Sequence, residues 1–140
     1  MKQIYLLLMG CMLSLSALAQ SSFDLYKISS IRTDFFDKSA AEIVAFDSAS
    51  QQLYFTNTHL NILSIVSISD PKSPAIVSQI DMSPYGGTIN AVSVSNGLVA
   101  ATVEADTIGE NGRVVFLDAA GEYISDLEVG VLPDWLIFNH

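Results

Sequence analysis

Four short apolar runs separated by turn-forming residues lie between Ala41 and Asp81, and this pattern constrains the fold more than any other feature of the sequence. Short runs that recur about every 8–12 residues predict an antiparallel meander of β-strands. A four-stranded unit that repeats about every 40 residues is typical of a β-propeller blade. The strands predicted for this first unit are Glu42–Phe46, Leu53–Asn57, Ile62–Ser69 and Ala75–Asp81.

The following region repeats the pattern. Val92 matches Val44 at a spacing of 48 residues, and Leu98 matches Leu53 at a spacing of 45. Asn96-Gly97 predicts a two-residue hairpin, because both residues tolerate a positive φ. The strands predicted for this second unit are Ile89–Ser95, Leu98–Val103, Arg113–Asp118 and Tyr123–Val129.

A third unit is predicted to begin at Pro133, with Asp134–Phe138 as its first strand. Leu136 follows its counterpart Val92 by 44 residues. No segment keeps a period of about 3.6 residues between helix caps, so helices are not expected. We therefore predict an all-β fold in which residues 41–140 form a β-propeller fragment of about two and a half four-stranded antiparallel blades.

The first 19 residues have the features of a signal peptide. Lys2 supplies the positive end, an apolar stretch runs from Ile4 to Leu18, and small residues precede a predicted cleavage site before Gln20. A transmembrane anchor is the less favoured interpretation, because a span needs about 20 apolar residues. A lipoprotein signal, with Cys11 acylated, is the other alternative. Cleavage as a signal peptide implies export, to the periplasm, the cell surface or the extracellular space.

Export and composition exclude several classes of function. Cys11 is the one cysteine, so cleavage before Gln20 leaves no thiol for a disulfide, a metal or nucleophilic catalysis. The net charge changes from −9 to −10 when Lys2 is removed, since it is the one charged residue in the segment. A chain this acidic lacks the basic face that nucleic-acid binding requires.

Residues 20–40 are predicted to form an amino-terminal strand and a connector. The alternation of apolar residues in Asp24–Ile31 indicates a strand that precedes the first blade and is available to close a ring by joining the last one. In a fragment this strand lacks its sheet, so residues 20–140 are expected to form two stacked four-stranded sheets with this strand loosely placed. Such a polypeptide would aggregate or stay partly unfolded, because its apolar faces and strand edges remain open.

Several segments together resemble the choice-of-anchor I family. They are SAAEIVAFD, LYFTN, SISDPKSPAIVSQIDMSPYGG, INAVSVSNGLVAATVEA, NGRVVFLDAAG and VGVLPDWLIF, between Phe35 and Phe138. The resemblance implies a secreted or cell-surface β-propeller, similar to mesenchyme-specific cell surface glycoprotein, with a seven-bladed ring and a variable carboxy-terminal anchor. The family continues where this sequence stops, so we expect an amino-terminal fragment that lacks the remaining blades.

The sequence offers no catalytic nucleophile constellation. His59 falls in a predicted loop and His140 is the last residue, so neither can be placed beside a serine and a carboxylate. Two distant histidines without a mature cysteine also disfavour zinc. Gly86-Gly87 and Gly109–Gly112 are better explained as turns than as a phosphate-binding loop.

Carboxylates at strand ends are the candidate metal ligands. Glu42 and Asp134 begin the innermost strands of their units, and Glu104 ends the second strand of the second unit. Calcium binds several oxygen ligands, so Glu42, Glu104 and Asp134 are predicted to contribute to a calcium site at the channel. The alternative is that they cap strands or solvate the channel. Trp135 is interpreted as core or channel lining, with a sugar-stacking platform as the alternative.

Two functions remain open. The first is a non-enzymatic, secreted or cell-surface scaffold that binds an unknown extracellular ligand. The alternative is a calcium-dependent hydrolase of phosphate esters, an analogy at the level of the fold. A phosphoryl-transfer site needs positive charge or metal, and the mature chain has five basic residues: Lys27, Arg32, Lys38, Lys72 and Arg113.

Overall fold

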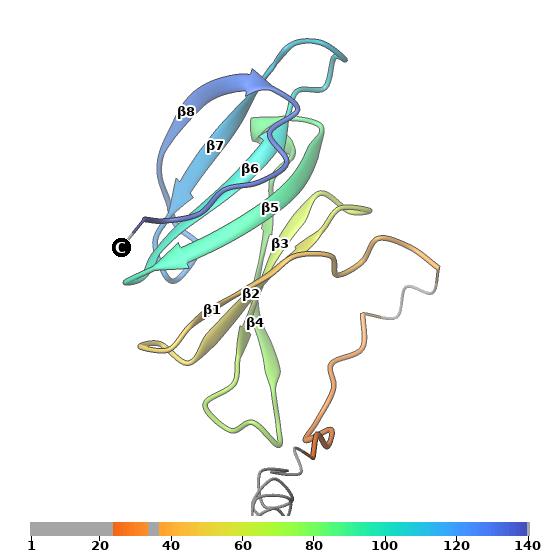
Figure 1. The fold of residues 1–140 in the computed structure, drawn as a ribbon, viewed down its shortest axis with the longest axis vertical. Helices are drawn as coiled ribbons and strands as arrows, with labels where there is room; N and C mark the ends of the chain where they lie inside the picture. The colour runs from red at the N-terminus through yellow and green to blue at the C-terminus, as the bar shows by residue number, and fades with distance from the viewer. Residues whose placement is uncertain (1–23, 34–36, 140) are drawn as a thin grey trace, which may run out of the picture.

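The computed structural model describes residues 24–33 and 37–139, and it contains two four-stranded antiparallel sheets (Figure 1). The predicted signal peptide lies outside these residues. Each sheet is a meander in which strands pair in chain order. The first sheet consists of β1 (Val44–Asp47), β2 (Gln52–Asn57), β3 (Ile62–Ser67) and β4 (Ala75–Asp81). The second consists of β5 (Thr88–Ser95), β6 (Leu98–Glu104), β7 (Asn111–Leu117) and β8 (Tyr123–Val131).

All eight strands of the two predicted units are therefore confirmed, with ends shifted by at most a few residues. The connector between the sheets contains a short 3₁₀ helix, η2 (Ser83–Tyr85), which the sequence pattern did not predict. The described residues include no helix long and apolar enough to cross a membrane. The stacking of two sheets is what was expected for these residues.

Equivalent turns of the two sheets are stabilised by equivalent aspartates. Asp70 follows β3, and its carboxylate accepts a hydrogen bond from the Lys72 amide at 3.0 Å. Asp118 follows β7, and its carboxylate accepts one from the Ala120 amide at 2.9 Å. In both turns the aspartate carbonyl also accepts an amide from three residues on, at 3.0 Å. An Asp side chain that bonds the backbone two residues ahead favours a turn at this point.

A buried threonine of the second strand holds the amino-terminal part of the first strand in each sheet. The Thr56 hydroxyl of β2 accepts the Ile43 amide at 3.2 Å, and the Thr102 hydroxyl of β6 accepts the Ala91 amide at 2.9 Å. Val44 and Val92 are equivalent in this register, as the sequence predicted. The predicted match of Leu53 with Leu98 is wrong by one residue. Leu53 stands three residues before Thr56, and the residue three before Thr102 is Val99.

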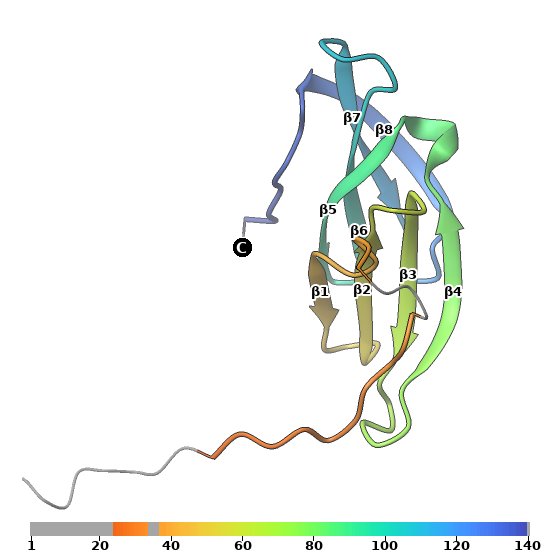
Figure 2. The ribbon, with the colours of Figure 1, turned by 90° about the vertical axis from the view of Figure 1, so that its right-hand side faces the viewer.

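The core lies between the two sheets. Strands alternate their side chains between two faces, and the facing set is almost wholly apolar. Figures 1 and 2 show the sheets packed face to face, and β5 contacts both β1 and β2. The buried cluster consists of Tyr54, Leu63, Ile65, Met82, Ile89, Val92, Val99, Ala101, Val103, Val115 and Leu117.

Polar side chains also join the sheets. Asn61 is buried in the β2–β3 turn; its Nδ2 donates to the Gly86 carbonyl at 2.8 Å, and its Oδ1 accepts the Ile89 amide at 2.8 Å. The Tyr54 hydroxyl donates to the Ala119 carbonyl at 3.0 Å, across the interface. Because these groups are buried, the bonds fix the position of one sheet on the other.

Two predicted strands are absent from the described residues. Asp24–Ile31 and Asp134–Phe138 are extended but not paired, so neither is a strand. A strand requires a neighbour for its ladder of backbone hydrogen bonds, and no strand of the two sheets pairs with either segment. The first segment is largely in solvent, with Leu25 86% exposed, although the Ser29 hydroxyl donates to the Pro71 carbonyl at 2.6 Å. The first segment was predicted to join the last blade of a ring and the second to begin a third blade, and the described residues form neither blade.

Candidate binding cleft

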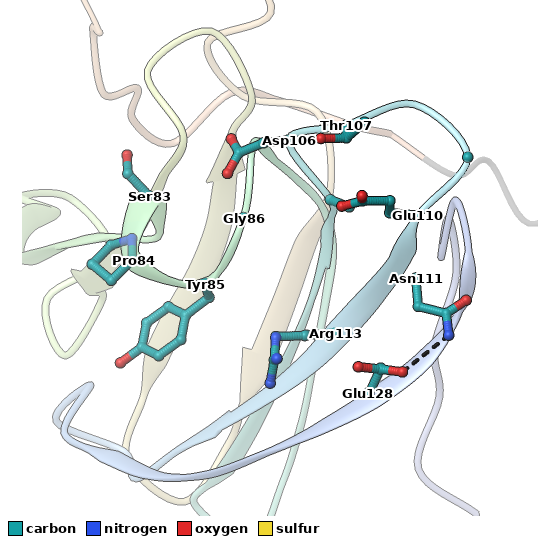
Figure 3. Close-up of a pocket in the computed structure, with 12 residues that line it drawn as sticks. Ser83, Pro84, Tyr85, Gly86, Asp106, Thr107, Glu110, Asn111, Arg113 and Glu128 are labelled. Carbon is teal, nitrogen blue, oxygen red and sulfur yellow. Dashed lines mark hydrogen bonds between the residues drawn. The ribbon is translucent and has the colours of Figure 1, made fainter.

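A polar cleft of about 670 Å³ opens at one end of the second sheet (Figure 3). Three segments that are separate in sequence form its walls: the connector that contains η2, the loop between β6 and β7, and the paired strands β7 and β8. Its lining residues are Ser83, Pro84, Tyr85, Gly86, Ala105, Asp106, Thr107, Gly109, Glu110, Asn111, Arg113 and Glu128.

Glycine allows the connector to lie directly against the end of β6. The Gly87 amide donates to the Glu104 carbonyl at 2.9 Å. A Cβ atom on Gly86 would lie 2.3 Å from the same carbonyl oxygen, which no side chain could accept without a backbone shift. The two glycines that the sequence placed in a turn therefore set one wall of the cleft.

The β6–β7 loop forms the opposite wall. A turn closes it, in which the Glu110 amide donates to the Thr107 carbonyl at 3.2 Å and Gly109 has a φ of 89°. Residues 106–111 are exposed, so their polar side chains face solvent and the cleft. Figure 3 shows Asp106 and Glu110 projecting from this loop on the side that faces the connector.

An ion pair with aromatic neighbours forms the floor. Arg113 of β7 pairs with Asp126 of β8, and the Tyr123 hydroxyl donates to the other oxygen of Asp126 at 2.6 Å. These bonds to Tyr123 and Arg113 lower the pKa of Asp126, while the same hydrogen bond raises the pKa of Tyr123. Tyr85 stacks on Tyr123 with ring centroids 5.5 Å apart, so the connector rests on this network.

Hydrogen-bond acceptors predominate around the opening. Asp106, Glu110 and Glu128 contribute carboxylates, and the Asn111 amide donates to Glu128 at 3.0 Å. Because Asp126 neutralises Arg113, the lining has a net negative charge. A cleft of this kind favours a polar ligand that offers hydrogen-bond donors.

The structure does not bring the predicted calcium ligands into one cluster. Glu42 precedes β1 and accepts the Thr58 hydroxyl at 2.8 Å; Glu104 ends β6; Asp134 lies in the extended segment after β8. Among residues 24–33 and 37–139, no group of three or more His, Cys, Asp or Glu residues is arranged to hold a metal. Calcium binding by these three residues stays a prediction.

Trp135 and His59 do not line the cleft, and His140 lies outside the described residues. Trp135 is 71% exposed and is not part of the core. It borders a smaller apolar cavity of about 270 Å³ between the extended carboxy-terminal segment and strands β1 and β5. His59 is exposed in the β2–β3 turn, where its amide donates to the Ser39 carbonyl at 3.1 Å.

Sequence reasoning did not select Tyr85, Glu110 or Arg113 as site residues. The loop length was the available signal, since residues 105–112 form a longer polar connection than the other turns of the two units. The pairing of this loop with the connector before β5 depends on how the strands are ordered in space. No single sequence motif predicts that arrangement.

Comparison with known protein families shows the family to which the chain belongs. A family model for the choice-of-anchor I domain matches residues 42–140, which include both sheets. The chain belongs to the choice-of-anchor I family. A search of curated proteins found no match. The resemblance inferred from the sequence is thus confirmed, and membership points to a surface-associated domain.

Proposed function

We propose that this choice-of-anchor I chain contributes the first two blades of a secreted or cell-surface β-propeller, which acts as a binding scaffold. The repeated framework of the two sheets supports this proposal, because each uses the same threonine and aspartate hydrogen bonds. The outer face of the first sheet also carries exposed apolar side chains, including Val44 (62%) and Phe46 (53%), as a blade does where another blade packs on it.

The cleft is the proposed ligand site, and its composition is the observation on which this assignment rests. Three separate segments converge there, whereas the remainder of the second sheet contributes mainly to packing. Acceptors on the walls and a tyrosine at one side suit an extracellular ligand with hydroxyl or amino groups, such as a polysaccharide or a basic peptide. No observation favours a phosphoesterase, so only binding is proposed.

The proposal can be tested with arrays of polysaccharides and basic peptides. The labelled chain is compared with a variant that carries Asp106→Asn and Glu110→Gln, substitutions that keep the loop polar and remove two charges. Glu122→Gln is the matched control, because Glu122 is an exposed acid in the β7–β8 turn outside the cleft. We expect binding to fall at least tenfold in the cleft variant and to be unchanged in the control.

Equal binding by all three proteins would move the ligand site away from the cleft. Absence of binding to every member of the arrays would exclude both proposed ligand classes.

A further inference from the structure

Two Asn-Gly pairs occur in this chain, and the structure places them in contrasting surroundings. Asn96-Gly97 forms the two-residue turn between β5 and β6, and Asn111-Gly112 begins β7. Asn-Gly is the dipeptide most prone to spontaneous deamidation, because glycine has no side chain to hinder attack by its own amide nitrogen. Local structure then decides which pair reacts.

The first pair is open to reaction. Asn96 is exposed, with a φ of 51°, and Gly97 follows with a φ of 77°. The Asn96 side chain makes a long hydrogen bond of 3.4 Å to the Ser95 hydroxyl. Space around the glycine is also available, since an added Cβ would meet only the Ala119 Cβ, at 3.7 Å. The side chain can therefore rotate toward the Gly97 nitrogen.

The second pair is held. The Asn111 side chain donates to Glu128 at 3.0 Å, which fixes its orientation away from its own backbone. Gly112 is buried in a strand, where an added Cβ would lie 2.6 Å from both the Val103 carbonyl oxygen and the Pro133 ring. Ring closure would require the backbone to leave this close contact.

We infer that Asn96 is a site of spontaneous modification, at which the turn between β5 and β6 deamidates while Asn111 is protected. The Gly97 nitrogen loses its proton and attacks Cγ of Asn96, a new C–N bond forms, and the Cγ–Nδ2 bond breaks to release ammonia. Water then opens the resulting succinimide at either carbonyl. The products are aspartate, or isoaspartate with one additional carbon in the main chain.

The modification weakens the turn on which the second sheet depends. Ser95 pairs with Leu98 across this turn, and the buried Val99 pairs with Val94 one position further along. A two-residue hairpin fixes strand register through its length, so an added backbone carbon disturbs this pairing. A new negative charge appears in a chain that is already acidic.

Peptide mapping by mass spectrometry tests the inference. The purified full chain is incubated at mildly alkaline pH in water enriched in heavy oxygen, so that each deamidated site acquires a label from the solvent. We expect label and isoaspartate at position 96 to accumulate at least tenfold faster than at position 111. The same incubation in urea should bring the two rates together, because both sites are then unstructured Asn-Gly pairs.

Equal rates in the folded chain, or faster reaction at position 111, would overturn the inference. So would an unreactive Asn96 in a folded chain whose urea-treated form reacts at both sites. An Asn96→Gln variant should remain unlabelled there, since glutamine closes the corresponding ring far more slowly, and its melting temperature should not decline during incubation as that of the unmodified sequence does.

Discussion

The β2–β3 turn of the first sheet and the β6–β7 loop of the second occupy equivalent positions but do different work. The turn is short, and its Asn61 is buried and bonded to the connector. The loop is longer, and its residues 106–110 are exposed at the cleft. The same position in two similar sheets thus joins the sheets together in the first and lines the cleft in the second.

The largest difference in stability should appear when one residue of the turn and one residue of the loop are each replaced by alanine. Asn61→Ala leaves the buried Ile89 amide and the Gly86 carbonyl without partners, so we expect a loss of about 2–4 kcal/mol in the free energy of unfolding. Glu110→Ala in the exposed loop should change it by no more than about 0.5 kcal/mol. Urea titration of both variants measures the difference, and similar losses would show that the two loops are not distinct in this way.

The threonines test whether the two sheets share one framework. Thr56→Val and Thr102→Val keep the shape of the side chain and remove the acceptor for a first-strand amide. Each should cost about 1–3 kcal/mol, with the larger value for Thr102, because the Ala91 amide is buried and the Ile43 amide is partly exposed. If one substitution were neutral in thermal unfolding, the shared role of these hydroxyls would be lost.

Tyr54 tests the bond that crosses from one sheet to the other. Tyr54→Phe removes the hydroxyl that donates to Ala119 and leaves the buried ring in place. We expect a loss of about 1 kcal/mol, as for a single hydrogen bond. Ser48→Ala, in the exposed β1–β2 turn, is a control for the removal of a hydroxyl that does not cross the interface. A Tyr54→Phe chain as stable as the unmodified chain would mean that the bond to Ala119 adds nothing to the Asn61 bonds and the apolar packing that join the sheets.

The smallest effect concerns the hairpin turns, which differ in their chemistry. Asp47 closes the β1–β2 turn, and the Ser50 hydroxyl at 2.6 Å, together with turn amides, lowers the pKa of its carboxyl. Because the pKa is lower in the folded state, the ionised Asp47 carboxylate stabilises the fold at pH values above its ordinary pKa. This stabilisation is lost as the pH falls through the pKa of the folded state, here below about pH 4. Asp47→Asn should reduce this acid dependence in thermal melts, whereas Asn96→Asp, in the β5–β6 turn, should not reduce it.

Much of this framework could be predicted from the sequence, because it depends on local signals. Alternating apolar residues identified all eight strands, and Asn96-Gly97 identified its hairpin. Asp24–Ile31 and Asp134–Phe138 have the same alternation, but a strand also needs a partner, which alternation cannot supply. The roles of Thr56 and Asn61 were missed for a related reason. Each depends on which distant amide lies within reach, and only the stacked sheets decide that.

The cleft was less predictable than the framework. Its walls join residues that are about twenty or more positions apart, and its floor depends on the pairing of β7 with β8. The carboxylates selected from strand ends, Glu42, Glu104 and Asp134, were chosen for a channel whose remaining walls these residues do not form. Polar loop residues were harder to rank, because loops are polar whether or not they bind anything.

The exposed tip of the β6–β7 loop is also a position at which this chain should tolerate an inserted peptide. Ile108 is 98% exposed, and an added Cβ on Gly109 would meet nothing within 4 Å. Loop closure becomes only slightly less favourable as a loop lengthens, and tips of this kind accept insertions well. An epitope or affinity peptide placed between Thr107 and Gly109 would be displayed beside the cleft, on a scaffold whose strands need not be redesigned to receive it.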